Sequence, residues 1–138
     1  MNRGNVALVG LVILAVVIAV ASPAGARGAP AQPDCSWTGV WDTAFLDHTG
    51  GEEATTVLQA TQDGAVVTGA YDFRQGVLAG TAEGATLSGS WMQGPSYRAP
   101  EDLGEFEFTM AADCASFGGR WRYAGDDLWS VWIGQRRS

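Results

Sequence analysis

The amino-acid sequence predicts an all-β fold, an eight-stranded antiparallel up-and-down β-barrel, and three observations carry this prediction. Past residue 35 the apolar residues show no helical period, whereas Gly, Thr, Val and aromatic residues are frequent and turn signals recur regularly. The segment 105–110 alternates polar and apolar residues, which is typical of a strand with one buried face. A Gly-x-aromatic motif, preceded by a small residue, recurs four times at intervals that place its aromatics on alternate strands of one meander.

Turn-forming residues bound each of the first four expected strands. Gly and Asp favour such positions because they tolerate the backbone conformations of tight turns. In chain order these strands are expected at 36–46, 54–61, 65–73 and 77–82. The tight turns that follow the second, third and fourth are Gln62-Asp63-Gly64, Arg74-Gln75-Gly76 and Glu83-Gly84.

The second half of the folded chain repeats this pattern. The remaining strands are expected at 86–93, 104–112, 116–124 and 128–136. Within 104–112 the alternation of Glu, Phe and Met is the clearest in the chain, with the apolar residues expected to face the core. Gly125-Asp126-Asp127 signals the turn between the last two strands.

The repeated motif favours the barrel over the alternative fold, a two-sheet β-sandwich. In each copy the glycine and the aromatic residue are two positions apart, so both face the same side of the sheet. Each of these strands therefore presents a glycine, which has no side chain, and a large aromatic residue on the same face. Such alternation of small and large residues fits the taper of a small barrel, and glycine lets a strand coil sharply. We expect the aromatics at one level, with Trp41, Trp91 and Trp121 filling the barrel. The copies are Thr38-Gly39-Val40-Trp41, Thr68-Gly69-Ala70-Tyr71, Ser88-Gly89-Ser90-Trp91 and Gly118-Gly119-Arg120-Trp121.

The two longest connections, 47–53 and 94–103, both follow odd-numbered strands, so an up-and-down barrel places them at one end, the predicted mouth. Cys35 and the turn that bears Cys114 fall at the opposite, closed end. These are the only two cysteines of the chain, and we expect them to form a disulfide. The alternative is a pair of unpaired buried thiols.

One folded domain is expected behind a targeting segment. Residues 1–26 combine an early arginine, a long run of Val, Leu, Ile and Ala, and a small-x-small site, which predicts a signal peptide or, if uncleaved, an N-terminal membrane anchor. Residues 27–34 are rich in Ala, Pro and Gly and are expected to be a flexible linker, whereas 35–138 forms the barrel domain. The domain is then secreted or extracytoplasmic, contacts a membrane only through 1–26, and keeps its disulfide in an oxidising compartment.

Charge and composition exclude several classes of function. The 138 residues carry a formal net charge of −7 and include no lysine, which argues against nucleic acid as a partner because phosphate binding needs a cationic face. One histidine and two cysteines form no metal-ligand pattern, and Asp126-Asp127 lack the spacing of a calcium loop. No nucleophile or phosphate-binding motif is present. We therefore expect no metal, no cofactor and no enzymatic activity.

Gly39-Val40-Trp41 on the first expected strand resembles the Gly-x-Trp of the calycins, the group of barrels that includes avidins and lipocalins. In lipocalin-like barrels an arginine of the last strand packs over this tryptophan, and the resemblance implies that structural role for Arg136 or Arg137. Thr68-Gly69-Ala70-Tyr71 is similar to the Thr-Gly-x-Tyr signature of the avidins. The resemblance implies a fold rather than an activity.

The biotin pocket of the avidins matches this chain at one position only. Tyr71 corresponds to its tyrosine, but Thr43, Asp47 and Phe73 stand where the resemblance would require Asn, Ser and Ser. A site that binds through hydrogen bonds loses most of its affinity without those partners, so biotin is not expected as the ligand. The chain also resembles small secreted prokaryotic domains of unassigned activity that carry a loop similar to 95–100.

Four residues are candidate ligand contacts at or below the mouth. The loop 95–100 begins and ends with proline, and a stiff loop loses little entropy when a ligand binds. Tyr97 and Arg98 within it are therefore candidate lid residues, although Tyr97 could instead pack on the barrel rim. Tyr71 and Trp91 are candidate contacts inside the barrel.

Two further features admit a functional and a structural interpretation. His48, the only histidine, lies among carboxylates and could act as a base or a ligand contact, but the adjacent Gly-Gly favours a solvated loop. Trp129 and Trp132 are three positions apart on one expected strand, so they must face opposite sides of the sheet. One of them should lie outside the barrel and be available for an interaction.

Three functions remain open. The first is a non-enzymatic, secreted or surface-tethered binding module for a small apolar, aromatic or sugar ligand. The second is a structural or envelope-associated domain with a solid core that binds protein or polymer, and the third is a small barrel enzyme with His48 or a carboxylate turned inward. Interior volume distinguishes the first two, because a ligand site needs a contiguous cavity of about 300 Å³ or more beneath 94–103.

Overall fold

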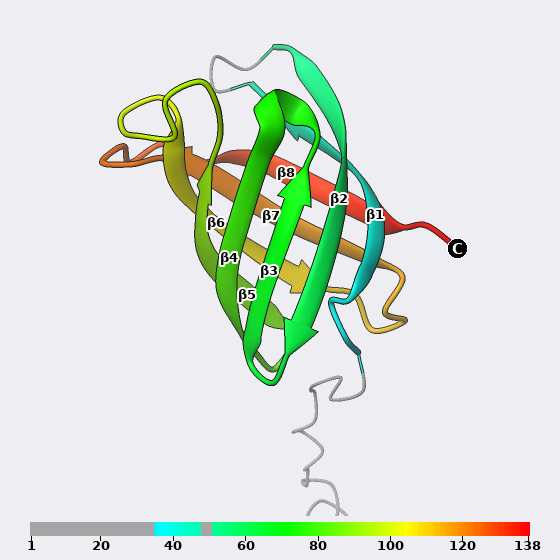
Figure 1. Ribbon diagram of the computed structural model, residues 1–138. Helices are drawn as coiled ribbons and strands as arrows, with labels where there is room; N and C mark the ends of the chain where they lie inside the picture. The colour runs from blue at the N-terminus through cyan, green and yellow to red at the C-terminus, as the bar shows by residue number, and fades with distance from the viewer. Residues whose placement is uncertain (1–34, 48–50) are drawn as a thin grey trace, which may run out of the picture. The chain divides into compact units, whose positions relative to one another are not determined.

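The computed structural model describes residues 35–47 and 51–138 as a closed antiparallel barrel (Figure 1). Each strand pairs with its neighbours in sequence, and the last strand pairs with the first. The strands are β1 (Gly39–Leu46), β2 (Glu53–Asp63), β3 (Val66–Tyr71), β4 (Gly76–Glu83), β5 (Thr86–Met92), β6 (Leu103–Met110), β7 (Ser116–Tyr123) and β8 (Ser130–Arg136). The predicted class and the eight-stranded meander are confirmed, and the sandwich alternative is wrong.

Some sequence predictions fall on other parts of the chain. The expected signal or anchor at 1–26, the expected linker 27–34 and His48 lie outside the described residues. Within 35–47 and 51–138, no helix is long and apolar enough to cross a bilayer.

The alternation expected for the sixth strand is present in β6. Phe106, Phe108 and Met110 are buried, while the intervening Glu105 and Glu107 keep half-exposed side chains on the outer surface. Burying a side chain of this size stabilises the fold by about 1.5–3 kcal/mol, so the period of two fixes which face of the strand turns inward. The last strand begins at Ser130 rather than at 128 as expected, so Trp132 is buried on β8, whereas Trp129 precedes the strand and lies half-buried against the guanidinium groups of Arg120 and Arg122.

The glycines of the repeat allow neighbouring strands to approach closely. Gly89 pairs in register with Gly80, and a Cβ atom on Gly89 would lie 2.0 Å from the carbonyl oxygen of Ala79. A Cβ atom on Gly119 would likewise lie 2.4 Å from the carbonyl oxygen of Glu107. Any larger residue at these positions would push two strands apart, so the glycines let the sheet coil into a narrow barrel.

Trp41 lies lower in the barrel than the other repeated aromatics, so the expectation of one level is wrong. Trp41 and Tyr71 belong to one line of register partners across β2. Because barrel strands are tilted, such a line climbs along the barrel axis. The line of register partners through Trp91 meets β3 at Gly69, two residues before Tyr71, and the line through Trp121 meets β5 at Gly89, two residues before Trp91. This shift of two residues at each step offsets the climb. Tyr71, Trp91 and Trp121 consequently share the upper part of the barrel, and Trp41 stays below.

The closed end is held by a disulfide and an arginine. The predicted Cys35–Cys114 disulfide is present, with its Cα atoms 5.4 Å apart, and none of the described cysteines is free. Arg136 lies over Trp41, with its guanidinium carbon 4.3 Å from the ring centroid. Its three nitrogens donate hydrogen bonds to the carbonyl oxygens of Cys114, Thr38 and Ser36 at 2.9, 2.8 and 2.7 Å. One side chain therefore ties β8 to the chain entering β1 and to the β6–β7 turn.

The third strand is shorter than expected. It was predicted to reach residue 73 but ends at Tyr71, and Phe73–Gln75 forms a short 3-10 turn, η2. Arg74 and Gln75 adopt positive φ values of 50° and 52°, which a continuing strand cannot accommodate. The turn carries the side chains of Phe73 and Arg74 to the open end of the barrel, where they border the candidate site.

Candidate functional site at the barrel mouth

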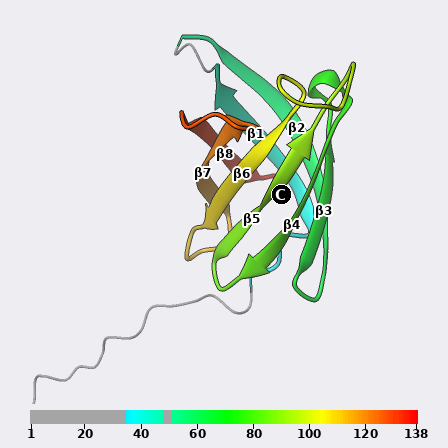
Figure 2. The ribbon, with the colours of Figure 1, turned by 90° about the vertical axis from the view of Figure 1, so that its left-hand side faces the viewer.

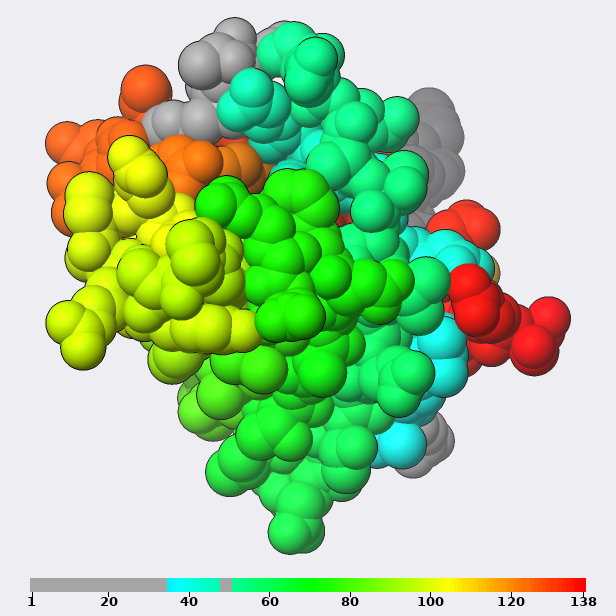
Figure 3. Space-filling model, turned by 45° about the horizontal axis from the view of Figure 1, so that its top comes forward, coloured from blue at the N-terminus to red at the C-terminus, as the bar shows by residue number. Residues whose placement is uncertain are grey.

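Four connections surround the open end of the barrel. The β1–β2, β3–β4, β5–β6 and β7–β8 segments all lie at this end, opposite the tight turns of the closed end (Figure 2). Seen from above, the 94–103 loop lies beside the β3–β4 turn (Figure 3). The amide N–H of Gly94 donates to the carbonyl oxygen of Arg74 at 2.8 Å, which joins these two segments. The predicted position of the mouth is therefore correct.

A cavity of about 260 Å³ opens at this end and is called here the mouth cavity. It is slightly smaller than the 300 Å³ or so expected for a ligand site, yet the barrel is not solid. Its walls are mostly aromatic, and the aromatic residues that line it are Phe45, Tyr71, Phe73, Trp91, Trp121, Tyr123 and Trp132. The polar residues that line it are Asp47, Glu52, Glu53, Arg74 and Gln93.

The aromatic walls form a connected set of rings. Trp121 packs at 90° against Tyr123 with centroids 4.9 Å apart, and at 78° against Trp91 at 5.8 Å. Across the cavity, Phe45 packs at 82° against Phe73 at 5.0 Å. Edge-to-face pairs of this kind fix ring orientation and add about 0.5–1.5 kcal/mol each beyond area burial. The walls of the cavity are therefore preformed rather than loose side chains.

The buried tryptophans differ in whether their indole N–H groups are hydrogen-bonded. The indole N–H of Trp41 donates to the carbonyl oxygen of Trp37 at 3.0 Å, and that of Trp121 donates to the carbonyl oxygen of Leu46 at 3.2 Å. The indole N–H groups of Trp91 and Trp132 are buried and have no hydrogen-bond partner among the described residues. These two N–H groups are enclosed by protein, so a ligand in the mouth cavity could not accept a hydrogen bond from them. Each is an unpaired buried donor that lowers the stability of the fold.

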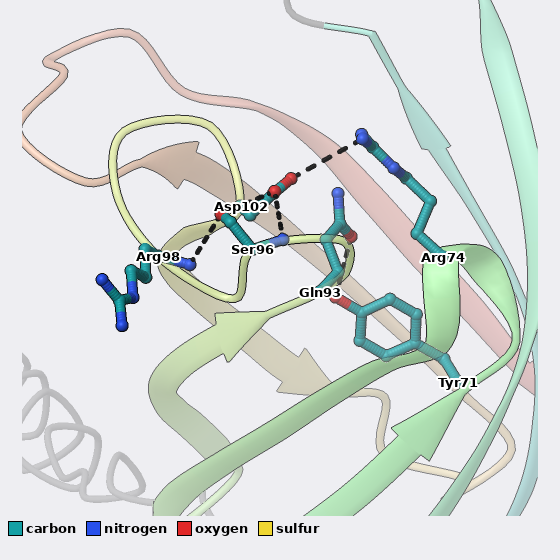
Figure 4. A network of polar contacts seen from close by, with 6 residues as sticks. All are labelled: Tyr71, Arg74, Gln93, Ser96, Arg98 and Asp102. Carbon is teal, nitrogen blue, oxygen red and sulfur yellow. Dashed lines mark hydrogen bonds and ion pairs between the residues drawn. The ribbon is translucent and has the colours of Figure 1, made fainter.

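Tyr71 connects the cavity wall to the polar loop above it. Its hydroxyl donates to Oε1 of the buried Gln93 at 3.1 Å (Figure 4). Burial is the main cause that raises the pKa of Tyr71, with a smaller contribution from Tyr97. The phenol is therefore neutral throughout the physiological range and acts as a hydrogen-bond donor within the wall.

Asp102 anchors the 94–103 loop. Its Oδ2 accepts hydrogen bonds from the amide and the hydroxyl of Ser96 at 3.0 and 2.8 Å, and its Oδ1 lies 3.7 Å from the guanidinium of Arg74. These contacts hold the pKa of Asp102 below its ordinary value, chiefly through the backbone and side-chain hydrogen bonds of Ser96, with Arg74 adding to them against the effect of burial. Figure 4 shows Asp102 between the loop and η2, so one carboxylate joins both segments of the rim.

The structure separates the predicted contacts into two groups. Tyr71 and Trp91 line the cavity, and Trp121, predicted only as a structural residue, lines it as well. Tyr97 lies on the outer rim, where its hydroxyl donates to the carbonyl oxygen of Gln75 at 2.9 Å. The Arg98 side chain extends away from the Asp102 network (Figure 4). Neither Tyr97 nor Arg98 lines the cavity, so the geometry does not favour a lid role for either residue.

Several residues of the site were not singled out from the sequence. Phe45 shares the inward parity of Trp41 on the first strand, and this signal was available. Gln93 precedes the 94–103 loop and Asp102 lies near its end, but no spacing distinguishes them from solvated loop residues. Arg74 reaches the rim only because η2 interrupts the strand. Among the described residues, no group of three or more His, Cys, Asp or Glu side chains is placed to hold a metal ion.

Comparison of the chain with models of protein families, with curated proteins and with solved structures gives no match in any of the three. The fold and the mouth cavity are therefore the observations from which a function is inferred.

Proposed function

We propose that the protein is a non-enzymatic binding module that holds one compact apolar or aromatic molecule in the mouth cavity. The observation that supports this function is the preformed aromatic cavity of about 260 Å³ at the open end of an otherwise closed barrel. Ligand sites are typically concave, mostly apolar and furnished with few polar groups, as this one is. The hydroxyl of Tyr71 is paired with Gln93 and most of the wall is aromatic, which favours an aromatic or aliphatic body.

We also propose that this module is calycin-like and works outside the cytoplasm, secreted or tethered at the surface. The closed eight-stranded barrel and the stacking of Arg136 over Trp41 support the first proposal. The Cys35–Cys114 disulfide supports the second, because such bonds persist in oxidising compartments. The apolar character of 1–26 agrees with an export segment.

A cavity-filling variant tests the binding function. Ala54 lines the mouth cavity, so Ala54→Phe should fill it without removing a wall, whereas Ala70→Phe places the same side chain on the exposed outer surface of β3. The probe is N-phenyl-1-naphthylamine, a neutral dye whose emission rises in apolar surroundings. We expect A54F to weaken dye binding by about tenfold or more while its Tm remains within a few degrees of the parent, because overpacking at an open rim is easily relieved.

The outer-surface variant provides the comparison. A70F should bind the dye as the parent does. Equal dye binding by the parent, A54F and A70F would place the dye elsewhere and contradict a ligand site in the mouth cavity.

A second candidate, an envelope-associated domain that binds protein or polymer, is favoured by the outer surface of β8. Val131 and Ile133, two positions apart on the same face, are 44% and 47% exposed there. Clustered apolar side chains on a small domain commonly mark an interaction surface. Cosedimentation with insoluble envelope material, weakened by V131T/I133T but not by A54F, would support this function.

A further inference from the structure

The charges around the mouth cavity are unequally distributed. Among the described residues that line it, Asp47, Glu52 and Glu53 are carboxylates, called here the lip carboxylates, and only Arg74 is cationic. Glu52 and Glu53 are exposed, and no ion pair within residues 35–47 and 51–138 involves either of them. The entrance therefore carries negative charge that the described part of the protein does not neutralise.

Two described cationic side chains near the mouth, Arg74 and Arg98, are respectively paired with a carboxylate and directed away from the Asp102 network. The guanidinium of Arg74 lies 3.7 Å from Asp102, whose side chain is only 8% exposed. The side chain of Arg98 extends away from the network (Figure 4). The buried indole N–H groups of Trp91 and Trp132 are enclosed by protein and cannot reach an anionic oxygen. Within the described part of the chain, an anionic ligand would thus meet the three carboxylates, while the one cationic group that lines the cavity is already paired with Asp102.

A hydroxyl in the wall experiences the same negative field. The pKa of Tyr123, which lines the cavity, is raised by burial first and then by the carboxylates of Asp47, Glu101 and Asp102, with Arg74 opposing them. These carboxylates therefore act on a group in the cavity wall as well as on the entrance.

We infer that the mouth cavity selects a small organic cation, an ammonium group on a compact apolar or aromatic body, over neutral and anionic molecules of the same shape. The inference rests on the proposed binding function and adds the charge of the ligand to it. Aromatic side chains attract cations through the negative face of the ring, most strongly where water is excluded. The lip carboxylates would attract the same charge during approach and hold it at the entrance.

The test uses probes that differ in charge and little in shape. Phenyltrimethylammonium and tert-butylbenzene are isosteric, with a positively charged nitrogen in the first where the second has carbon, and benzenesulfonate supplies the anion. Binding is measured by quenching of intrinsic tryptophan fluorescence and by calorimetry at low salt. We expect the cation to bind about 3- to 30-fold more tightly than its neutral isostere, and the anion to bind most weakly.

A double variant separates local from overall charge. Glu52→Gln with Glu53→Gln removes two carboxylates from the lip, and Asp63→Asn with Glu83→Gln makes the same change of net charge at exposed turns of the closed end. At low salt the lip variant should lose about three- to tenfold in affinity for phenyltrimethylammonium and nothing for tert-butylbenzene. The closed-end variant should behave as the parent.

The outcomes distinguish the two proposals. If tert-butylbenzene binds as tightly as the cation, or if both double variants weaken the cation equally, the inferred charge selectivity is overturned while the binding function stands. If no probe of any charge binds, the proposed function itself is overturned.

Discussion

The closed end and the mouth of the barrel differ in how completely their buried polar atoms are paired and their interior is filled. At the closed end, the polar atoms near Trp41 are paired: its indole N–H bonds to Trp37, and Arg136 satisfies three carbonyl groups while it covers the ring. At the mouth, Trp91 and Trp132 retain unpartnered N–H groups within the described part of the chain, and a cavity remains between the rings. The closed end is optimised for stability, whereas the mouth gives up part of that stability for space.

Strained backbone conformations occur at both ends of the barrel but are more frequent at the mouth. Among the described non-glycine residues, Arg74, Gln75 and Tyr97 have positive φ values and lie at the mouth, while Cys114 has one at the closed end. Such conformations cost of order 1 kcal/mol each and persist where the surroundings fix them. Cys114 is fixed by its disulfide, and the rim residues are fixed by hydrogen bonds between η2 and the 94–103 loop. The rim is thus a constrained framework around an unfilled site.

The largest expected difference between the two ends comes from one substitution made at each. Phe117 is 3% exposed, stacks on Phe108 with centroids 4.2 Å apart and packs 5.4 Å from Trp41. Phe117→Ala should lower the free energy of unfolding by about 3–5 kcal/mol, because it leaves a cavity in a closed core. Phe73 is half-buried beside an existing cavity, and Phe73→Ala should cost only about 1–2 kcal/mol.

Denaturant unfolding of both variants under one condition measures this difference. Equal losses of stability, or a larger loss for F73A, would show that the mouth is packed as tightly as the closed end and would break the comparison.

The barrel could be predicted from the sequence because its signals are local. The period of two along β6, the turn residues and the glycine two positions before each aromatic all act within a few residues. The level of each repeat could not be read from the number of strands, since it depends on strand tilt summed around the barrel, although the calycin resemblance implied an arginine of the last strand over Trp41. Counting strands placed Trp41 beside Trp91, whereas the register places it with Arg136.

The candidate site was predicted in part for a related reason. Tyr71 and Trp91 carry the repeat, so their inward direction followed from the motif, although their proximity to an open cavity did not. Tyr97 and Arg98 were chosen because their loop is stiff, but stiffness does not determine where a side chain points. The contacts of Asp102 join residues on two different connections, and no sequence spacing encodes them.

A second prediction sharpens the comparison by testing how the closed end is held. Arg136→Met keeps the aliphatic length but leaves three carbonyl groups without their donor and removes the cation from the face of Trp41. We expect a loss of about 2–4 kcal/mol in the free energy of unfolding, reduced by the partial exposure of the site. Arg137→Met, which breaks only an exposed ion pair with Asp42, is the matched control and should change stability little. Similar losses for the two variants would contradict the proposed role of Arg136.

The smallest expected effect concerns pH and the carboxylate that holds the rim. Because the pKa of Asp102 is lowered in the folded state, its ionised form adds stability that is fully present above the unfolded pKa of about 3.9 and disappears as the pH falls through the folded pKa. The parent should exceed Asp102→Asn in Tm by a few degrees near neutral pH, and this advantage should shrink below about pH 4.

Asp42 supplies the control on the outer surface, since its pKa is also lowered, mainly by its hydrogen bond from Arg137, but its side chain is 55% exposed. The advantage of the parent over Asp42→Asn should be smaller and should vanish in high salt, because water and ions screen an exposed pair. The advantage over D102N should survive high salt, since Ser96 donates two hydrogen bonds to a largely buried carboxylate. A difference between the parent and D102N that stays constant with pH would mean that the rim does not depend on the charge of Asp102, and the mouth would then be held by neutral contacts alone.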